Sequence, residues 1–479
     1  MFQLAEINLT RSTMLRWGVL VLVAKLALFT FFTVCRSDQW PAEDVVKGIA
    51  LVGGDTPQYY KPCETFIQGE GYQSICRMPG LLPFYVPLRL LLDEANTKVT
   101  IVFIQLLFDV LATLMLAMVA ARIFGSQRAF IWTCMLYGLS TFVSIRSHYL
   151  LSDAFNTSML IFSIYFLSNY LIYTQRKALL IAGVFIAWSL FFRPVVVVAY
   201  PCIALLLFVY QDKKIWTTVK SYVWFVAPTL VVLSLWTVRN ISSYQRPIVL
   251  IAGADECMNK FTPQQQAIRD FIITMGEDFQ PWSAGSGAEW FLQKKVNYKE
   301  QHPFSENDFT GAYNLDSLVA LKENYVRFVQ LEPNNATYSE LGNAIVNSAH
   351  TFATAYKKEH ATRYYVMNRI NFIRMFLFPN RLDDLPLPAM SDMNMIQKGA
   401  KAASYILLLL VHTLACVAML YFLWKKRWMH FVWGLLPFAF VALLGYMGFI
   451  EQRYLTAAYP FMVLLVVGFV VSLQPARKV

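Results

Sequence analysis

The stretch FIQLLFDVLATLMLAMVAARIFG, residues 103–125, decides the class of fold. Between Phe103 and Ala121 its only charged residue is Asp109, and the apolar run stops at a basic residue, Arg122. An apolar run of this length, coiled as an α-helix, matches the hydrocarbon core of a bilayer. The stretch therefore predicts a membrane-spanning helix over residues 99–121.

Apolar runs of the same kind recur on both sides of this stretch. The 479-residue chain is 57% hydrophobic and only 15% charged, which is little charge for a soluble protein of this size. We predict an all-α polytopic membrane protein, built as a bundle of about ten transmembrane helices. The ten predicted spans are residues 14–34, 99–121, 129–146, 155–174, 178–192, 195–211, 220–238, 402–424, 430–449 and 455–472.

Basic residues cluster at alternate turns between these spans. With the N-terminus in the cytoplasm, every cluster lies on the cytoplasmic side, which then holds about fourteen basic residues and two acids, Glu6 and Asp212. Such an excess orients helical membrane proteins. The net charge of +11 therefore indicates membrane orientation, and no nucleic-acid partner is predicted. The clusters are Arg11 and Arg16; Arg122 and Arg128; Arg176 and Lys177; Lys213, Lys214 and Lys220; Lys425, Lys426 and Arg427; Arg477 and Lys478.

The spans divide the chain into three parts. Residues 1–238 form an N-terminal transmembrane module, residues 239–401 an external α-rich domain, and residues 402–479 a C-terminal transmembrane module. The first module includes an external loop, 35–98, in which Met78–Asp93 predicts a helix lying in the membrane interface.

The external domain shows helical patterns separated by turns. Thr262 and Pro263 are typical of a helix N-cap followed by proline at the first helical position. Further helices are predicted over 286–300, 314–332 and 337–378.

Polar residues gather at the external ends of the spans. They are Asp55, Arg77, His148, Ser152, Asp153, Arg193, Arg239, Glu451 and Arg453. Arginine binds phosphate through forked, charge-assisted hydrogen bonds, and a carboxylate can take a proton from a hydroxyl nucleophile. This face therefore has the groups for acid–base chemistry on an anionic substrate.

Each of these residues also has an ordinary structural interpretation. Asp55 follows Gly53 and Gly54 and suits a turn or a helix cap, and Asp153 suits the cap of the fourth span. Arginines at span ends often reach toward lipid headgroups, and His148 suits a plain interfacial position. The functional interpretation depends on the whole set.

Three further pairs are open to test. Lys25 and Asp109 lie about ten residues inside their spans, and because charges inside a membrane are costly we expect them to form a structural ion pair. Cys63 and Cys76 share the first external loop and are compatible with a disulfide or with two free thiols. Tyr59 and Tyr60 suit either stacking on a sugar or packing under the loop.

Several motifs, in this order, resemble the GT-C superfamily of membrane glycosyltransferases. The resemblance is strongest to the bacterial branch of protein O-mannosyltransferases and lipid A aminoarabinose transferases, and it runs from Gly53 to Gly468. The motifs are GGDTPQYY (53–60), CRMPGLLPFYVPL (76–88), the opening stretch (103–125), SHYLLSDAFNTSML (147–160), FFRPVVVV (191–198), LWTVRNISSYQRPIVL (235–250), the segments 338–352 and 367–376, and EQRYLTAAYPFMVLLVVG (451–468).

The resemblance implies an inverting transferase that takes a sugar from a polyprenyl-phosphate donor. The acceptor would be a hydroxyl of a glycan, glycolipid or protein, and the reaction would face the periplasm at a bacterial inner membrane. Asp55 would be the general base, and Asp153 would orient the acceptor or a basic partner. The implied substrate-binding residues are Arg77, Arg193, Arg239, Arg374, Arg453, Glu451, Tyr59, Tyr60 and His148.

The chain departs from the family's pattern at two positions. The family often has glutamate where Asp153 stands, and often a second acid beside the first-loop aspartate, where this chain has Thr56. The second departure leaves open whether Asp55 and Asp153 hold a divalent cation.

Two other functions compete with this interpretation. A transporter or flippase would line a path across the bilayer with charges, whereas only Lys25 and Asp109 lie deep in the spans. A ligase or polymerase of lipid-linked glycans would also place arginines and a large loop outside. The first-loop aspartate and the Arg193-Pro194 turn favour the glycosyltransferase.

Overall fold

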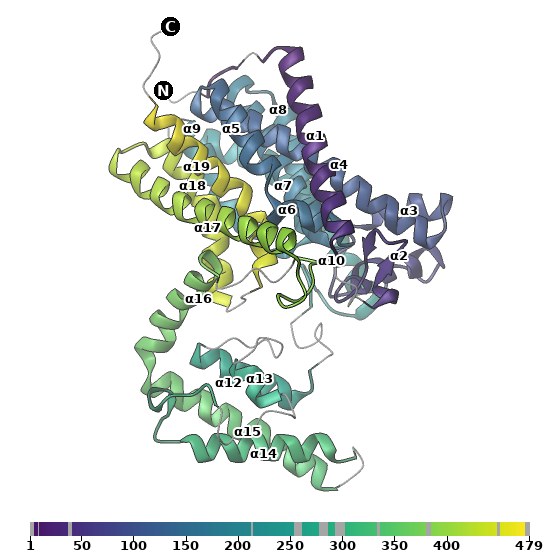
Figure 1. Ribbon diagram of the computed structural model, residues 1–479, viewed down its shortest axis with the longest axis vertical. Coiled ribbons are helices and arrows are strands. Elements are labelled where there is room, and N and C mark those ends of the chain that lie inside the picture. Colours follow the sequence, from purple (N-terminus) through teal and green to yellow (C-terminus); the bar gives the residue numbers. More distant parts are fainter. Residues whose placement is uncertain are drawn as a thin grey trace. The chain divides into compact units, whose positions relative to one another are not determined.

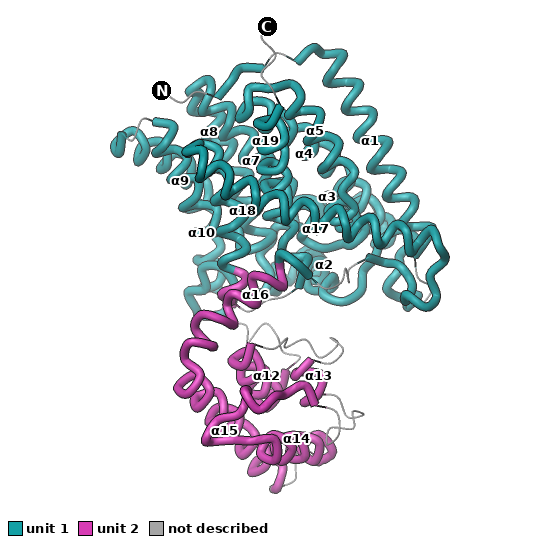
Figure 2. Tube along the Cα trace, turned by 60° about the vertical axis from the view of Figure 1, so that its left-hand side comes forward, with its two compact units in different colours: residues 1–251, 377–443, 451–479 teal, residues 252–376, 444–450 magenta. Residues whose placement is uncertain are grey.

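The computed structural model is almost entirely helical and divides into two compact units (Figure 2). The first unit holds residues 1–251, 377–443 and 451–479, and the second holds residues 252–376 and 444–450. The structure describes residues 4–7, 9–36, 41–211, 214–252, 261–276, 286–292, 302–332, 336–379, 385–447 and 451–474.

Helix α4 (Glu94–Phe124) contains the stretch that decided the fold (Figure 1). Asp93 caps it by accepting a hydrogen bond from the backbone of Asn96 at 2.8 Å, and Gly125 ends it with a φ of 59°, a conformation that favours glycine. The other long helices of the first unit are α1 (Arg11–Val34), α5 (Gln127–Gly138), α7 (Ser152–Tyr173), α8 (Arg176–Phe192), α9 (Ala199–Tyr210), α10 (Ile215–Tyr244), α17 (Met395–Trp424), α18 (Trp428–Met447) and α19 (Tyr459–Leu473). The last turn of α18, from Leu444, belongs to the second unit.

Short elements connect these helices. The loop after α1 contains a hairpin of two strands, in which Val45 pairs with Leu51 and Val46 with Ala50. The short elements are η1 (Ala42–Asp44), β1 (Val45–Val46), β2 (Ala50–Leu51), α2 (Pro57–Ile67), α3 (Leu82–Leu91), α6 (Thr141–Ser144), η2 (Ile145–His148), η3 (Pro194–Val198) and η6 (Gln452–Ala457).

Helix α7 is the centre of the first unit. It packs against α4 and α8, and every residue from Ser152 to Ile164 is buried. A helix that is buried on all sides must be placed by its neighbours rather than by solvent. The first turn of α7, which carries Asp153, is therefore held firmly.

Each of the ten predicted spans is mostly helical within the described residues, and the polytopic all-α membrane class is confirmed. Residues 448 and 449 of the predicted span 430–449 lie outside the described residues. Among the described residues, six helices (α1, α4, α7, α10, α17 and α18) are long and apolar enough to cross a bilayer, and a pair bent by 54°, Gln127–Gly138 with Thr141–His148, is a candidate for a seventh span. The remaining segments form shorter helices, α8, α9 with η3, and α19, so the number ten stays a prediction. Helix α3 forms within the segment predicted to lie in the interface.

Several predicted cytoplasmic turns lie at one end of the first unit. Ala5 donates a backbone hydrogen bond to Arg122 at 3.0 Å, and Arg128 Nη1 donates to Gln474 at 2.7 Å. Arg427 Nη1 likewise donates to Ser472 at 2.6 Å. These contacts join turns that are distant in the sequence, as the charge pattern requires.

The predicted ion pair inside the bundle is confirmed. Lys25 Nζ lies 2.8 Å from Asp109 Oδ2, with both side chains buried, and it also donates to Ser144 Oγ at 2.8 Å. The pair thus ties α1 to α4.

Both alternatives for Cys63 and Cys76 are wrong, because Cys63 is free whereas Cys76 is disulfide-bonded to a different cysteine. Cys63 is a buried free thiol whose Sγ donates to the Tyr59 carbonyl of its own helix at 3.5 Å. The thiol faces the helix backbone instead of a second sulfur.

The second unit is a small helical domain with its own core. Thr262 caps its first helix through a reciprocal capping box with Gln265, as predicted, and a predicted helix over 337–378 is interrupted by a π-helix. The apolar core includes Phe271, Trp290 and Tyr356. The elements are α12 (Pro263–Met275), α13 (Gly287–Leu292), η4 (Glu306–Asp308), α14 (Leu315–Gln330), α15 (Ala336–Glu359), η5 (Arg363–Met367, the π-helix) and α16 (Asn368–Leu377).

Candidate active site

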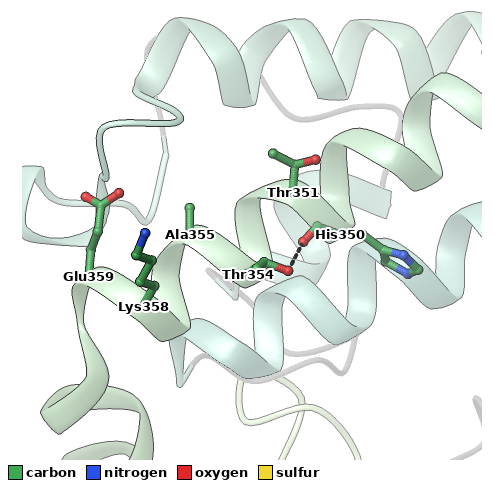
Figure 3. A pocket seen from close by; sticks show the side chains of 6 residues that line it. All are labelled: His350, Thr351, Thr354, Ala355, Lys358 and Glu359. Carbon is green, nitrogen blue, oxygen red and sulfur yellow. Dashed lines mark hydrogen bonds between the residues drawn. The ribbon is translucent and has the colours of Figure 1, made fainter.

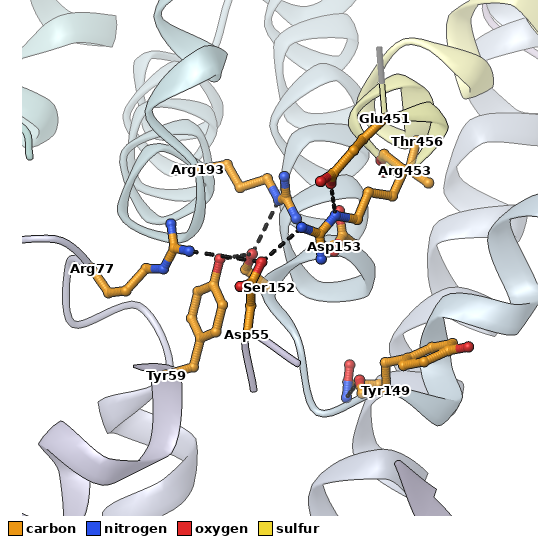
Figure 4. A network of polar contacts seen from close by, with 11 residues as sticks. Asp55, Tyr59, Arg77, Tyr149, Ser152, Asp153, Arg193, Glu451, Arg453 and Thr456 are labelled. Atoms are coloured by element: carbon orange, nitrogen blue, oxygen red, sulfur yellow. Dashed lines mark hydrogen bonds and ion pairs between the residues drawn. The ribbon is translucent and has the colours of Figure 1, made fainter. Parts of the chain in front are cut away.

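Asp55 lies at the turn between the β1–β2 hairpin and α2. Gly54 has a φ of +63°, which side chains disfavour, and a Cβ on Gly53 would lie 2.7 Å from the Asp44 carboxylate. Both glycines are therefore required locally. They turn the chain so that Asp55 leaves the loop toward η6, as Figure 4 shows.

Asp55 is ion-paired to an arginine from the distant C-terminal segment. Arg453 Nη2 donates to Asp55 Oδ2 at 2.7 Å, and Arg453 Nε donates to Glu451 on its other edge. Arg77 Nη2 approaches the same Asp55 oxygen at 4.0 Å. The acid therefore lies between two guanidinium groups (Figure 4).

Asp153 forms a second acid–arginine pair beside the first. Arg193 Nη2 donates to Asp153 Oδ2 at 2.6 Å, and Arg193 Nε donates to Ser152 Oγ at 3.1 Å. Ser152 Oγ in turn donates to Tyr59 Oη at 3.0 Å. Tyr59 thus connects α2, which follows Asp55, to the start of α7.

Aromatic rings link the two pairs. The Tyr454 ring lies 4.7 Å from the Arg193 guanidinium and 5.5 Å from that of Arg453, and the Tyr59 ring lies 4.9 Å from that of Arg77. Cations over aromatic faces are attracted to them, so the rings hold the arginines in place without neutralising them.

The charges of this cluster balance one another. Three arginines (Arg77, Arg193, Arg453) face three acids (Asp55, Asp153, Glu451). Burial lowers the pKa of Arg453, but Glu451 above all, with Asp153 and Asp55, more than offsets it and raises the pKa above its ordinary value. The pKa of Arg193 is likewise raised, because Asp153 outweighs the effect of burial. Both guanidiniums stay charged at any physiological pH.

Two polar atoms of the cluster have no hydrogen-bond partner among the described residues. Asp153 Oδ1 and Arg77 Nε are buried and unpaired. Buried polar atoms are normally satisfied in proteins, since leaving them unpaired is costly. One unpaired acceptor and one unpaired donor are groups to which a polar ligand can bind.

Arg239 lies beside the loop that carries Arg77. Its Nη1 donates to the Ser74 carbonyl at 2.9 Å and to Asn240 Oδ1 at 2.7 Å, and its guanidinium lies 5.0 Å from the Trp236 ring. Arg239 therefore supports the loop that presents Arg77.

Two predicted site residues pack elsewhere. His148 is buried and stacks on Phe29 with ring centroids 4.0 Å apart, so its surroundings do not favour substrate binding. The Tyr60 and Tyr85 rings stack with centroids 6.2 Å apart, and Lys98 Nζ lies 3.9 Å from the centroid of the Tyr60 ring. Tyr60 therefore packs within the protein, which is the second of its two predicted roles. Arg374 is exposed on α16, and its role at the site stays a prediction.

Sequence reasoning did not assign roles to Ser152 and Tyr454. Both are direct neighbours of predicted residues, Asp153 and Arg453. Ser152 was noted only as one polar residue among several, and nothing in the sequence shows that the Tyr454 ring lies between two arginines.

Whether Asp55 and Asp153 hold a divalent cation stays a hypothesis. Among the described residues, no group of three or more His, Cys, Asp or Glu side chains is placed to hold an ion. Oδ2 of each aspartate is instead bound to a guanidinium. We therefore derive no step through a divalent cation.

A separate depression lies on the surface of the second unit. Its lining residues, shown in Figure 3, all lie on one face of α15: His350, Thr351, Thr354, Ala355, Lys358 and Glu359. A depression formed by one face of a single helix is open, whereas sites for small molecules are concave. We assign no function to it.

Residues 81–238 match the dolichyl-phosphate-mannose-protein mannosyltransferase family. This segment contains Asp153 and Arg193, and the match confirms the resemblance to GT-C membrane glycosyltransferases. A comparison with curated proteins finds no match.

Two solved structures illustrate the distance to known proteins. The archaeal oligosaccharyltransferase AglB from Archaeoglobus fulgidus, solved with an inhibitory peptide and a dolichol-phosphate, is 12% identical, with a TM-score of 0.49. The match covers 96% of this chain and 50% of AglB, so the chain spans about half its length. ArnT from Cupriavidus metallidurans is 14% identical over 95% of this chain and 77% of ArnT, with a TM-score of 0.33.

Proposed function

We propose that this chain is an inverting glycosyltransferase that moves a sugar from a polyprenyl-phosphate donor to an acceptor hydroxyl. The observation that carries the proposal is the convergence of two acid–arginine pairs, Asp55–Arg453 and Asp153–Arg193, from four distant segments. The proposed site lies on the membrane face opposite the basic clusters. The proposed reaction contributes to cell-envelope glycan synthesis or to protein glycosylation.

In this mechanism Asp55 is the general base. The acceptor oxygen attacks the anomeric carbon of the donor sugar and forms a new glycosidic bond. The bond between that carbon and the phosphate oxygen breaks from the opposite side, which inverts the configuration. The acceptor proton passes to Asp55, and polyprenyl phosphate leaves with the bonding electrons.

The balance of charge explains why the base is paired with an arginine. The donor phosphate carries one negative charge, and the leaving phosphate carries two. As Asp55 takes the proton, its attraction for Arg453 falls, and Arg453 becomes available to the oxygen on which negative charge develops. Arg453 would thus pair with Asp55 before the reaction and with the leaving phosphate after it.

The second pair has a positioning role. Asp153 is held by Arg193 through Oδ2, and its buried Oδ1 is unpaired among the described residues. An acceptor or sugar hydroxyl that donates to Oδ1 would complete its hydrogen bonding. Arg77, with its unpaired Nε, supplies a donor on the other side of Asp55.

The proposal is tested with the purified chain in liposomes. A panel of polyprenyl-phosphate monosaccharides and candidate acceptor glycans, glycolipids and peptides is supplied, and released polyprenyl phosphate is measured together with the anomeric configuration of the product. We expect stoichiometric release and inversion with one donor. The donor sugar and acceptor are first narrowed by comparing envelope glycans and glycoproteins from cells with and without the chain.

Other outcomes would overturn the proposal. Transfer only from pyrophosphate-linked oligosaccharides would identify a lipid-linked glycan ligase or polymerase. Movement of the lipid across the bilayer without cleavage of the sugar–phosphate bond would identify a flippase. Retention of configuration would exclude the single displacement at Asp55.

A further inference from the structure

The break between α15 and α16 exposes a group of apolar side chains. Here the helix passes through the π-helix Arg363–Met367. Four large apolar side chains are at least half exposed: Tyr365 (65%), Val366 (50%), Met367 (55%) and Ile370 (59%). We call these four residues the apolar patch. Because large apolar side chains grouped in this way mark a contact surface, we expect a partner to cover the apolar patch.

The apolar patch lies beside the end of a candidate membrane span, within the same compact unit. Arg369 Nη1 donates to the carbonyl of Tyr446, near the end of α18, at 2.7 Å. A Cβ on Gly445 would lie 2.6 Å from Ile373 of α16, so the absence of a side chain at Gly445 allows the two helices to touch. The start of α16 is therefore fixed to the last turn of α18.

This contact sets the depth of the apolar patch in the membrane. Helix α18 is long and apolar enough to cross a bilayer, and its last residues, Tyr446 and Met447, are 71% and 50% exposed. Tyrosine at the end of a membrane span is typical of the boundary between headgroups and acyl chains. The apolar patch is thus continuous with a surface at that boundary.

The charged neighbours fit the same boundary. Arg369 lies between the Tyr446 and Tyr364 rings, at 5.3 and 5.2 Å, and Arg374 is exposed one turn beyond Ile370. Arginines beside exposed apolar and tyrosine side chains are typical of helices that lie in the interface. No acidic residue occurs between Thr362 and Pro379, so anionic headgroups would meet no repulsion from this segment.

We propose that the apolar patch is an interfacial anchor whose partner is the bilayer itself. The four side chains of the apolar patch insert at the level of the headgroup–acyl boundary, and the Arg374 guanidinium lies at the lipid phosphates. The anchor holds the start of α16 at the surface of the membrane from which α18 emerges. This assignment is independent of the proposed reaction.

The test measures the depth of a spin label in the full chain. Ile370→Cys carries a nitroxide in a chain whose partly exposed cysteines, Cys35, Cys202 and Cys416, are replaced by serine. Thr351→Cys, on the exposed face of α15, is the matched control. Both are placed in nanodiscs of phosphatidylethanolamine and phosphatidylglycerol, and collisions with oxygen and with a water-soluble nickel chelate are compared.

Oxygen concentrates in the acyl region and the nickel chelate in water, so the ratio of the two collision rates reports depth. We expect oxygen to be favoured at position 370 and nickel at position 351. Nickel favoured at position 370 would show that the apolar patch faces water. Exclusion of both reagents at position 370 would show that protein covers it. Either result would overturn the anchor, and neither depends on enzyme activity.

Discussion

At the scale of single residues, the Asp55–Arg453 pair defines the proposed site. Arg453 binds Glu451 through Nε and Asp55 through Nη2, so it uses two edges of one guanidinium. Only arginine has several donors in a rigid planar fork. The role of Arg453 therefore depends on its shape as well as its charge.

Arg453→Lys is expected to weaken donor use. A single ammonium cannot hold Glu451 and Asp55 at once and still reach a phosphate, and loss of one charged hydrogen bond costs about 1.5–3 kcal/mol. We expect the kcat/KM for the donor to fall by roughly 10- to 100-fold, measured as polyprenyl phosphate released. Glu70→Gln, an exposed acid of the external loop that carries Asp55, is the control. Donor kinetics unchanged in Arg453→Lys would remove Arg453 from the phosphate site.

Tyr454 is expected to act through its ring, which lies between Arg193 and Arg453. Tyr454→Phe keeps the ring and should leave the donor KM near normal. Tyr454→Leu removes two cation–ring contacts, each about 0.5–2 kcal/mol, and should raise the KM by at least severalfold. Equal KM values for the two variants would show that the ring does not position the arginines.

At the scale of elements, the Lys25–Asp109 pair joins two spans, α1 and α4. Removing one partner leaves a buried charge, which typically costs about 3–5 kcal/mol. Asp109→Leu should therefore lower the unfolding temperature in detergent, and Lys25→Met combined with Asp109→Leu should recover much of the loss. A double variant as unstable as the single one would contradict a coupled pair.

Helix α14 gives a prediction about pH. Lys322 is buried and donates to the Phe291 carbonyl at 2.7 Å, and burial lowers its pKa from 10.5 to about 8. Between pH 8 and 10.5 the unfolded chain binds more protons at this site than the folded chain, so stability should rise with pH in that window. The protection factors of α14 amides against hydrogen exchange should rise with pH in this window, and more than in Lys322→Met. An identical pH response in both chains would contradict the buried cation.

The elements also show what the sequence can and cannot predict. Apolar length and caps located the ten helical segments, and Thr262 marked the start of α12. The break at residues 360–367 was missed, because these residues include no Gly or Pro to mark it. His148 and Cys63 look polar or reactive in sequence, but Phe29 stacks on one and the Tyr59 carbonyl accepts from the other. Their neighbours come from packing that no local pattern records.

At the scale of the whole molecule, charge is separated along the first unit. Its basic turns share one end through contacts such as Arg128 with Gln474. Asp55, in the turn after β2, and Asp153, in the first turn of α7, instead pair with arginines of η6 and of the end of α8 (Figure 4). The topology predicted from the basic clusters placed these residues on one face. Which acid pairs with which arginine required the fold, since Asp55 and Arg453 are separated by nearly the whole chain.

The central claim is that Asp55 takes the acceptor proton, and Asp55→Asn tests it most directly. The amide keeps the shape of the side chain but loses the base, so transfer in liposomes should fall by roughly 10²- to 10⁴-fold. Donor binding, measured separately, should not weaken, because Arg453 is released from its ion pair with Asp55. Transfer near the normal rate in Asp55→Asn, with Glu70→Gln as the matched control, would contradict the account.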